Sequence, residues 1–184
     1  MRIVAGRYRG TPLAAPRGTG TRPTGDRLRE SVFNVLTHRL PDLIPGARVL
    51  DLFAGSGAMG VEALSRGAAF VLFVETAVDA RAAIRRNLDA VGAAGEARIF
   101  RRDATRLGAP PAGAFTVAFA DPPYGRELGT AALEAAAAAG WLAAGAVAVL
   151  EERADALPAT LAGFETLDRR TSGDSAVGLY RRVE

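Results

Sequence analysis

Short apolar segments alternate with helical patterns along most of this chain, and no other feature of the sequence constrains the fold as strongly. Their length and continuity are typical of strands that are buried on both faces of a parallel sheet. Such segments occupy these positions: Val49–Phe53, Phe70–Glu75, Ala97–Phe100, Phe115–Ala120 and Ala146–Leu150. A helical pattern at Ala77–Val91 follows the second segment and stops before Gly92. Strands and helices in alternation predict an α/β fold with an open, mainly parallel sheet.

The last third of the chain follows a different pattern. The segments Glu165–Arg170 and Ala176–Val183 are separated by a short turn that contains Ser172, Gly173 and Asp174. A connection this short has no room for a crossover helix. The two segments therefore predict an antiparallel hairpin at the end of the sheet.

One apolar stretch, residues 131–150, is long enough to cross a bilayer. Glu134, Gly140 and Gly145 interrupt it, so we expect a helix, a turn and a buried strand instead. Arginines interrupt the apolar residues at the N-terminus, which has no continuous apolar stretch of signal-peptide length. These patterns predict a soluble, cytoplasmic protein without a membrane partner, and a monomer is the default expectation.

The length and composition agree with a single globular unit. With 184 residues, the core is large enough for folding without a metal or a disulfide. The chain has no cysteine, which excludes a disulfide scaffold and a cysteine zinc site, and no other metal-ligand cluster is evident. All 23 basic side chains are arginines, so the pI of about 10.1 overstates a formal net charge of only +3.

The charge is distributed unevenly along the chain. Residues 1–40 hold eight arginines against Asp26 and Glu30, a balance of +6. The other 144 residues hold fifteen arginines against eighteen acidic residues, a balance of −3. A basic cluster of this kind is typical of a nucleic-acid-binding arm. A solvated basic face is the alternative, because arginine replaces lysine throughout this chain.

The basic residues belong to an expected N-terminal extension. Arg2–Gly10 predicts one strand of a small hairpin, and Thr11–Pro23 is a linker rich in proline, glycine and threonine. Thr24 is a plausible N-cap for the helix that follows. Apolar residues recur there at helical spacing: Leu28, Val32, Val35 and Leu36. Three polar residues lie off that apolar face: Arg27, Arg29 and Glu30. We accordingly divide the chain into an extension, residues 1–45, and a main domain, residues 46–184.

A glycine-rich loop follows the first predicted strand. Gly55, Gly57 and Gly60 have the spacing G-x-G-x-x-G and open a helical segment. Glycines allow a sharp turn and a close approach to a ligand, and a helix N-terminus offers free N–H groups. The spacing is typical of a nucleotide-type cofactor site, although a tight turn alone gives the same pattern.

Three acidic residues stand at the ends of predicted strands. Asp51, just ahead of the loop, would repel a pyrophosphate but suits a cationic ligand such as S-adenosylmethionine, which carries an ammonium and a sulfonium. Glu75 can accept both hydroxyls of a ribose, a role that NAD sites share. Asp103 can accept a hydrogen bond from an adenine amino group; alternatively, it caps a helix or pairs with Arg101 and Arg102.

The tetrapeptide Asp121-Pro122-Pro123-Tyr124 follows the fourth predicted strand. Ligands of open α/β sheets bind beyond the carboxyl ends of the strands. The two prolines stiffen the backbone and remove two N–H groups, so that local carbonyls remain as acceptors. A carboxylate beside such a carbonyl matches an exocyclic NH2 group, and Tyr124 can stack on the attached ring.

These residues resemble the class I S-adenosylmethionine-dependent methyltransferases that act on planar amino groups and carry Asp/Asn/Ser-Pro-Pro-Tyr/Phe. The resemblance is strongest to the bacterial RsmD family, which methylates the N2 of a guanine in 16S ribosomal RNA. Three further blocks carry it: Arg2-Ile-Val-Ala-Gly-Arg-Tyr-Arg-Gly10, Arg22-Pro-Thr-Gly-Asp-Arg-Leu-Arg-Glu-Ser-Val-Phe-Asn34 and Asp51-Leu-Phe-Ala-Gly-Ser-Gly-Ala-Met-Gly-Val-Glu-Ala-Leu-Ser-Arg-Gly-Ala68. Four ordered blocks are far more specific than any one of them.

The resemblance implies a Rossmann-like sheet of seven strands in the order 3-2-1-4-5-7-6, and 16S RNA in the small ribosomal subunit or an assembly intermediate as the substrate. It implies a cofactor site formed by Asp51, Phe53, Ala54, Gly55, Ser56, Gly57, Glu75, Asp103 and Ala104. It implies target-base contacts from Asp121, Pro122, Pro123 and Tyr124. The residues expected to bind RNA are Arg7, Arg9, Arg22, Thr24 and Arg27.

The chain departs from the family pattern at two places outside the cofactor motifs. Gly25 stands where threonine or serine is frequent, and Ser172-Gly173 stands where an aromatic-glycine pair is common. Both departures affect the expected RNA contacts more than the chemistry. The only histidine, His38, is not required, because methyl transfer to an amino group needs no histidine base.

Three other functions remain open from the sequence. An NAD-dependent oxidoreductase fits the glycine loop but leaves the tetrapeptide unexplained. A methyltransferase for adenine N6 or for a protein amide shares the logic of the tetrapeptide. A cofactor-binding module that remodels RNA without catalysis is the third alternative.

Overall fold

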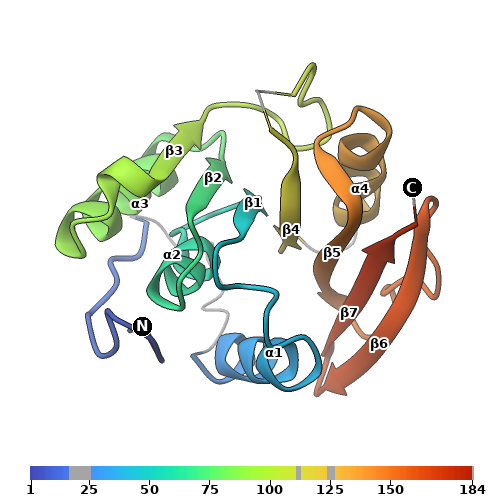
Figure 1. Ribbon diagram of the computed structural model, residues 1–184, viewed down its shortest axis with the longest axis horizontal. Coiled ribbons are helices and arrows are strands. Elements are labelled where there is room, and N and C mark those ends of the chain that lie inside the picture. The colour runs from blue at the N-terminus through green and yellow to red at the C-terminus, as the bar shows by residue number, and fades with distance from the viewer. Residues whose placement is uncertain (17–25, 111–112, 124–126, 184) are drawn as a thin grey trace.

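The computed structural model describes residues 1–16, 26–110, 113–123 and 127–183 (Figure 1). The helices are α1 (Asp26–Arg39), α2 (Ala58–Ser65), α3 (Val78–Ala90), the short 3-10 helix η1 (Ala94–Glu96) and α4 (Leu128–Ala138). The strands are β1 (Arg48–Leu52), β2 (Phe70–Val74), β3 (Ala97–Phe100), β4 (Phe115–Ala120), β5 (Leu142–Arg153), β6 (Phe164–Ser172) and β7 (Ser175–Arg182). The strands and helices predicted after residue 26 are present in this part of the chain.

The strands form one sheet in the order β3-β2-β1-β4-β5-β7-β6, which confirms the predicted order. β1 to β5 are parallel to one another, whereas β7 runs antiparallel to both β5 and β6. β1 begins and ends one residue earlier than predicted, and Phe53 lies outside the strand with a φ of 56°. β5 is longer than Ala146–Leu150, because the turn at Gly140 leads directly into the strand.

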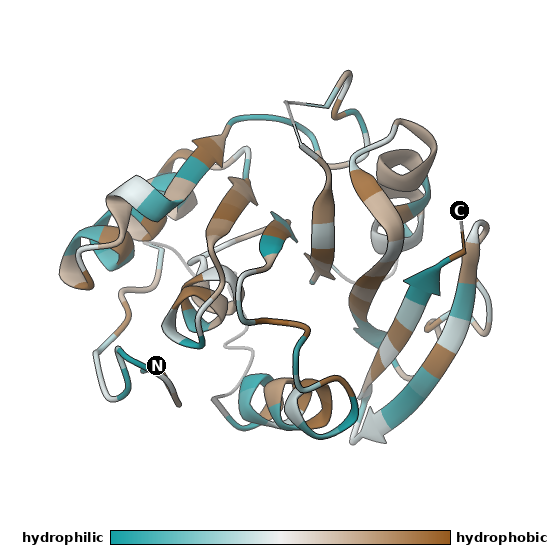
Figure 2. Cartoon of the chain, viewed as in Figure 1, coloured by the Kyte–Doolittle hydropathy of each residue, from teal (hydrophilic) through white to brown (hydrophobic). Residues whose placement is uncertain are grey.

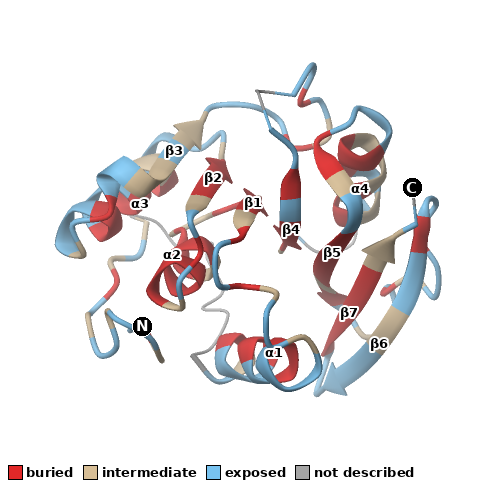
Figure 3. Ribbon diagram, viewed as in Figure 1, coloured by how far each residue is buried: buried red, intermediate tan, exposed pale blue. Residues whose placement is uncertain are grey.

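Side chains on both faces of the sheet are buried, as the continuous apolar segments require. α1, α2 and α3 cover one face, where Phe33 of α1 packs on Phe119 of β4 with ring centroids 5.5 Å apart. α4 and the loops around Leu107 and Leu157 cover the other face, together with the buried Trp141. The central strands are accordingly apolar and the edge strand β6 is largely polar (Figure 2) and exposed (Figure 3).

The predicted hairpin strand Arg2–Gly10 is wrong in its extent. The structure has a single antiparallel bridge between Arg2 and Pro12, and the chain turns from Ala5 onwards. The reason is that α2 takes the backbone groups that a strand would have used. Glu62 accepts hydrogen bonds from the N–H groups of Val4 and Ala5, at 2.8 and 3.0 Å.

Arg29 also departs from the expectation that it lies off the apolar face of α1. Its side chain is fully buried beneath the N-terminal segment. The guanidinium lies 3.5 Å from the Glu62 carboxylate and donates a hydrogen bond to the carbonyl oxygen of Arg2. The predicted N-cap, Thr24, lies outside the described residues.

Residues 1–16 pack into the same core as α1, α2 and α3 through Ile3 and Leu13. The division of the chain at residue 45 stays a prediction. Within the described residues, no helix combines the length and the apolar character that crossing a bilayer requires.

Candidate active site

The candidate site lies at the carboxyl ends of β1 to β4, where the parallel register brings the predicted acidic residues to one edge of the sheet. Leu52 is aligned with Val74 on one side and with Ala120 on the other. Glu75 and Asp121 are the next residues after these partners, and Asp51 directly precedes Leu52. Three carboxylates from three neighbouring strands thus lie at the same end of the sheet, with Asp51 two positions below the other two.

Asp51 is the most deeply buried of the three, with 3% of its surface exposed. Its Oδ2 accepts a hydrogen bond from the N–H of Gly60 at 3.0 Å. Burial raises the pKa of Asp51 well above its ordinary value, and the negative charges of Asp121 and Glu75 raise it further, against the opposing effect of the Gly60 N–H. The site therefore favours either a proton on Asp51 or a bound cation.

The glycine loop begins at Phe53 and is shaped by positive φ angles, 56° at Phe53, 55° at Gly55 and 76° at Gly57. A Cβ at Gly57 would lie 3.0 Å from Ile84, and a Cβ at Gly60 would overlap the ring of Phe73. These two glycines let α2 and the loop pack closely on β2 and α3. A Cβ at Gly55 would meet only the Phe53 carbonyl oxygen, at 3.9 Å, so the space above Gly55 is open.

Glu75 holds the loop in place from β2. Its two carboxylate oxygens accept hydrogen bonds from the N–H groups of Gly55 and Ala77, each at 2.8 Å. Each oxygen has a second lone pair, so the half-buried carboxylate retains the capacity to accept ribose hydroxyls. The loop residues Ala54 and Ser56 lie beside it, and Ala54 donates its N–H to the Val74 carbonyl at 3.1 Å.

Asp103 is exposed and stabilises a turn after β3. Its Oδ1 accepts hydrogen bonds from the N–H and the hydroxyl of Thr105, at 2.9 and 2.7 Å. These two bonds lower the pKa of Asp103. The capping role considered for this residue is thus present, in a turn rather than in a helix. Ala104 beside it is buried.

The start of the tetrapeptide leaves the sheet beside α4. Asp121 is partly buried, Pro122 is buried and Pro123 is exposed. A Cβ at Gly129 would lie 3.0 Å from Cγ of Pro122 and would overlap the side chain of Leu150. A glycine at this point of α4 therefore allows Pro122 to pack against the helix. Tyr124 lies outside the described residues.

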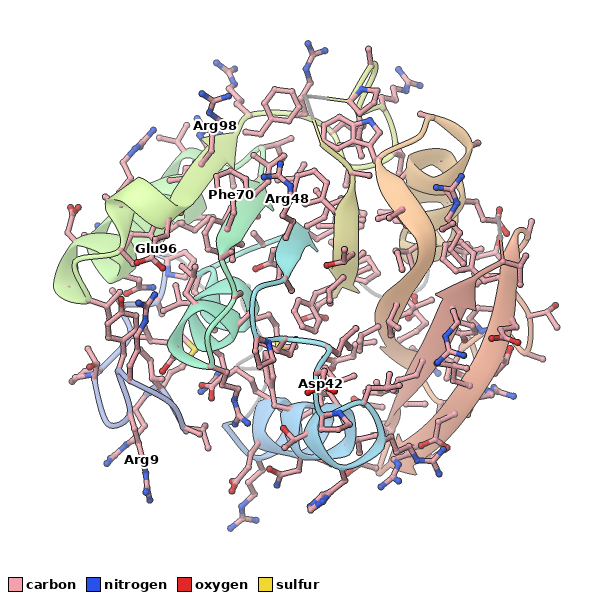
Figure 4. All side chains as sticks on the ribbon, viewed as in Figure 1. Arg9, Asp42, Arg48, Phe70, Glu96 and Arg98 are labelled. Atoms are coloured by element: carbon pink, nitrogen blue, oxygen red, sulfur yellow. The ribbon has the colours of Figure 1, made fainter. Side chains whose placement is uncertain are left out.

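The predicted RNA-binding residues have different surroundings. Arg7 forms an ion pair with Glu96 and lies over the ring of Tyr8, with 4.6 Å between Cζ and the ring centroid. Arg9 points away from the body of the molecule (Figure 4), and Arg27 is exposed on α1. Arg22 and Thr24 lie outside the described residues. Nor do the described residues contain a group of histidine and acidic side chains suited to a metal ion.

One residue that sequence reasoning missed connects the N-terminal segment to the glycine loop. Asn87 on α3 is buried and exchanges two hydrogen bonds with the backbone of Ala14, at 2.7 and 3.1 Å. Its amide also donates to the carbonyl oxygen of Ser56 at 2.8 Å. A polar residue beside Ile84 and Leu88 on the buried face of a predicted helix was the available signal.

This geometry agrees with the outcome of comparisons with known proteins. Residues 1–181 match the family described as Conserved hypothetical protein 95. The chain belongs to this family, the RsmD family. An RsmD relative, "Ribosomal RNA small subunit methyltransferase D" of Escherichia coli K12, is 36% identical over 99% of this chain and 90% of its own length. Another, "Putative rRNA methyltransferase YlbH" of Bacillus subtilis, is 34% identical over 99% of both chains.

The fold is that of the class I methyltransferases. The solved structure named "Putative methyltransferase yhhF from Escherichia coli" superimposes with a TM-score of 0.84 at 35% identity. The alignment covers 100% of this chain and 98% of that one. The RsmD architecture therefore extends over the whole chain, including the N-terminal segment.

Proposed function

We propose that this protein transfers the methyl group of S-adenosylmethionine to the exocyclic N2 of a guanine in 16S ribosomal RNA. The observation that carries the proposal is the position of Asp51, Glu75 and Asp121 around an open glycine loop. Mutual repulsion of three carboxylates disfavours a pyrophosphate ligand and favours a cationic one. Membership of the RsmD family and the names of the two relatives support RNA as the methyl acceptor.

The residues of the site fit the cofactor as follows. Asp51 and the open backbone at Gly55 would hold the charged amino-acid part, Glu75 the ribose, and Asp103 with Ala104 the adenine. When bound, S-adenosylmethionine supplies an electrophilic methyl group on a sulfonium. A cationic ligand bound at this site would lower the raised pKa of Asp51, because the positive charge stabilises the ionised carboxylate.

Asp121 and the tetrapeptide backbone act on the target base. An aromatic amine is a weak nucleophile, because its lone pair is delocalised into the ring. Asp121 and the Pro122 carbonyl accept hydrogen bonds from the amino group, localise that lone pair and align it with the methyl group. Positioning and electrostatics supply most of the rate. Tyr124 stacks on the extruded base and offsets part of the cost of unstacking it.

The first test is transfer of a labelled methyl group from S-adenosylmethionine to small ribosomal subunits, or to naked 16S RNA, from a strain that lacks this gene. We expect one labelled guanine N2, found by mapping the nucleotide and identifying the modified base. A labelled adenine would favour the N6-adenine alternative, which the tetrapeptide also accommodates. Absence of label on RNA, with label on a protein or on DNA, would contradict the proposal.

The second test is the Asp121→Ala variant. We expect methyl transfer to fall by about 100-fold or more, with little change in cofactor affinity measured by calorimetry. Glu165→Ala is the control, because Glu165 pairs with Arg181 on the surface at the start of β6, which is the opposite end of the sheet from Asp121. Unchanged turnover in Asp121→Ala would refute the assigned role.

The third test concerns the basic N-terminal residues. Replacement of Arg7, Arg9, Arg22 and Arg27 by glutamine is expected to weaken RNA binding and to flatten its salt dependence, with cofactor affinity intact. The ion pair with Glu96 reduces the share that we expect from Arg7. An unchanged salt slope would favour the alternative of a solvated basic face.

A further inference from the structure

A groove between α1 and the edge strand β6 gathers basic side chains that are far apart in the sequence. The groove has a volume of about 370 Å³. Its lining is polar except for Val35 and contains Arg27, Glu30, Ser31, Asn34, His38, Arg39 and Arg170. α1 and the arrowhead of β6 lie side by side in Figure 1. Three arginines, one histidine and one glutamate give this groove a positive balance.

Two of the arginines are held in place by one acidic residue. Nε of Arg170 lies 2.9 Å from Oδ2 of Asp168, and Nε of Arg39 lies 3.7 Å from the same oxygen. Asp168 is mostly covered, with 17% of its side chain exposed, whereas both arginine side chains are 52% exposed. Asp168 therefore fixes the position of both guanidiniums while about half of each arginine side chain stays accessible to solvent. This arrangement pre-organises donors for an anion.

The sheet register relates the groove to the target-base site. Arg170 is aligned with Val177, and Val177 is aligned with Glu151. Glu151 follows Leu150, the partner of Ala120, so Arg170 lies at the level of Asp121. The two positions are three strand spacings apart, or about 14 Å. On the α1 side, Phe33 packs on Phe119, two residues before Asp121.

We infer that this groove binds the RNA phosphate backbone next to the target nucleotide, through Arg27, Arg39 and Arg170, with Ser31, Asn34 and His38 as further polar contacts. The inference rests on the proposed function, because a strand whose base reaches Asp121 has to cross the same end of the sheet. It extends the RNA surface from the N-terminal arginines to β6. The expected ligand is RNA rather than an acidic protein. Guanidinium groups that lie next to a site for the target base can contact the successive phosphates of one RNA strand.

The test is the Arg39→Gln/Arg170→Gln double variant, compared with Arg98→Gln/Arg181→Gln as a control of equal charge. Arg98 lies on β3 at the opposite edge of the sheet (Figure 4), and Arg181 pairs with Glu165 outside the groove. Binding of naked 16S RNA is measured at several salt concentrations. We expect the groove variant to raise Kd about 10-fold at low salt and to reduce the salt slope by about 1 to 2. The control changes Kd less than about twofold.

A second variant, Asn34→Glu, adds a negative charge to the groove without removing an ion pair. We expect weaker RNA binding and a raised KM for RNA, whereas the affinity for S-adenosylmethionine stays that of the wild type. Equal effects of the groove and control variants on the salt slope would overturn the inference. Preferential binding of an acidic peptide over RNA by the wild-type protein would also overturn it.

The outcome is distinguishable from failure of the proposed function. If the wild-type protein methylates small-subunit RNA and both groove variants bind it as the wild type does, only the groove inference fails. If the wild type transfers no methyl group to RNA, the proposed function fails, and the salt slopes still decide whether the groove binds RNA.

Discussion

Asp51 and Glu62 are both buried acidic residues on neighbouring elements, and their surroundings are opposite. Glu62 accepts hydrogen bonds from two backbone N–H groups and faces the guanidiniums of Arg66 and Arg29, at 2.9 and 3.5 Å. Asp51 accepts one hydrogen bond, from Gly60, and faces two further carboxylates. The chain itself stabilises the charge of Glu62. Among the described residues none supplies a positive charge to Asp51, which therefore favours a proton or a cationic ligand.

This difference separates a structural site from a binding site. Burying a charge costs several kcal/mol, which hydrogen bonds and opposite charges have to offset. At Glu62 they anchor the N-terminal segment on α2, so the acid contributes to the fold. At Asp51 the cost remains in the free protein, and we expect cofactor binding to recover it.

Glu62→Gln is expected to have the largest effect on stability. The buried Arg29 loses its negative partner. In addition, the NH2 group of the glutamine is a donor and faces an N–H group whose hydrogen bond the carboxylate oxygen accepted. We expect the free energy of unfolding, measured with urea, to fall by about 3 to 5 kcal/mol. Glu165→Gln is the control, because Glu165 pairs with Arg181 on the surface. A loss below about 1 kcal/mol in Glu62→Gln would contradict the structural role.

Asp51→Asn is the matching substitution at the other buried acid, and its expected effect on stability has the opposite sign. The amide oxygen still accepts the Gly60 N–H, while the repulsion from Asp121 and Glu75 disappears. We expect the free protein to gain about 1 kcal/mol and the cofactor to bind about 30-fold more weakly, since a charge-assisted contact is lost. Unfolding and calorimetry measure the two effects. A destabilised variant with unchanged cofactor affinity would reverse the comparison.

The pH dependence of stability sharpens the same point. The raised pKa of Asp51 means that the folded protein keeps a proton that the unfolded chain has already lost. Between the ordinary value of 3.8 and the raised value, the contribution of Asp51 to the free energy of unfolding falls as pH rises. The stability gap between Asp51→Asn and the wild type should therefore widen with pH and then become constant. Unfolding curves across this range check it, and a gap that narrows with pH would contradict it.

Gly60 and Gly55 show the same difference between a structural position and a ligand-binding position. Gly60→Ala places a Cβ against the ring of Phe73, and we expect a loss of about 1 to 3 kcal/mol from overpacking. Gly55→Ala places a Cβ in the open space, so the cost is about 1 kcal/mol of backbone strain at φ 55° together with weaker cofactor binding. Thermal unfolding and calorimetry separate these effects. Equal cofactor affinity in Gly55→Ala and the wild type would mean that the cofactor does not occupy the space above Gly55.

Glu96→Gln is expected to have the smallest effect. Glu96 also pairs with an arginine, Arg7, but both side chains are partly exposed, 36% and 45%. An ion pair in contact with water contributes at most about 1 kcal/mol. We expect a change in unfolding free energy below this value, and the change should diminish at high salt. A loss comparable to that of Glu62→Gln would mean that burial does not distinguish these two acids.

Much of the fold and of the candidate site is predictable from the sequence, for a local reason. The strand segments from Val49 to Ala120 are short and mainly apolar, and the helix at Val78–Ala90 has apolar residues at helical spacing. Each element can therefore be predicted from its own residues alone. The positions of Asp51, Glu75 and Asp121 follow from this, because residues that end parallel strands meet at one edge of a sheet.

Other features depend on partners that are distant in sequence, so no local pattern predicts them. Arg29 looked like a surface residue because Glu62, its neighbour on α2, gives no local signal of the pair. The same holds for Asn87 with Ala14, and for Arg39 with Asp168 across the groove. Local patterns were enough to predict the strands and helices of the sheet, their order along the chain, and the glycine loop with the acidic residues around it. Tertiary packing determined which charges are buried and paired by the protein, because that depends on the side chains that other segments bring to the same place.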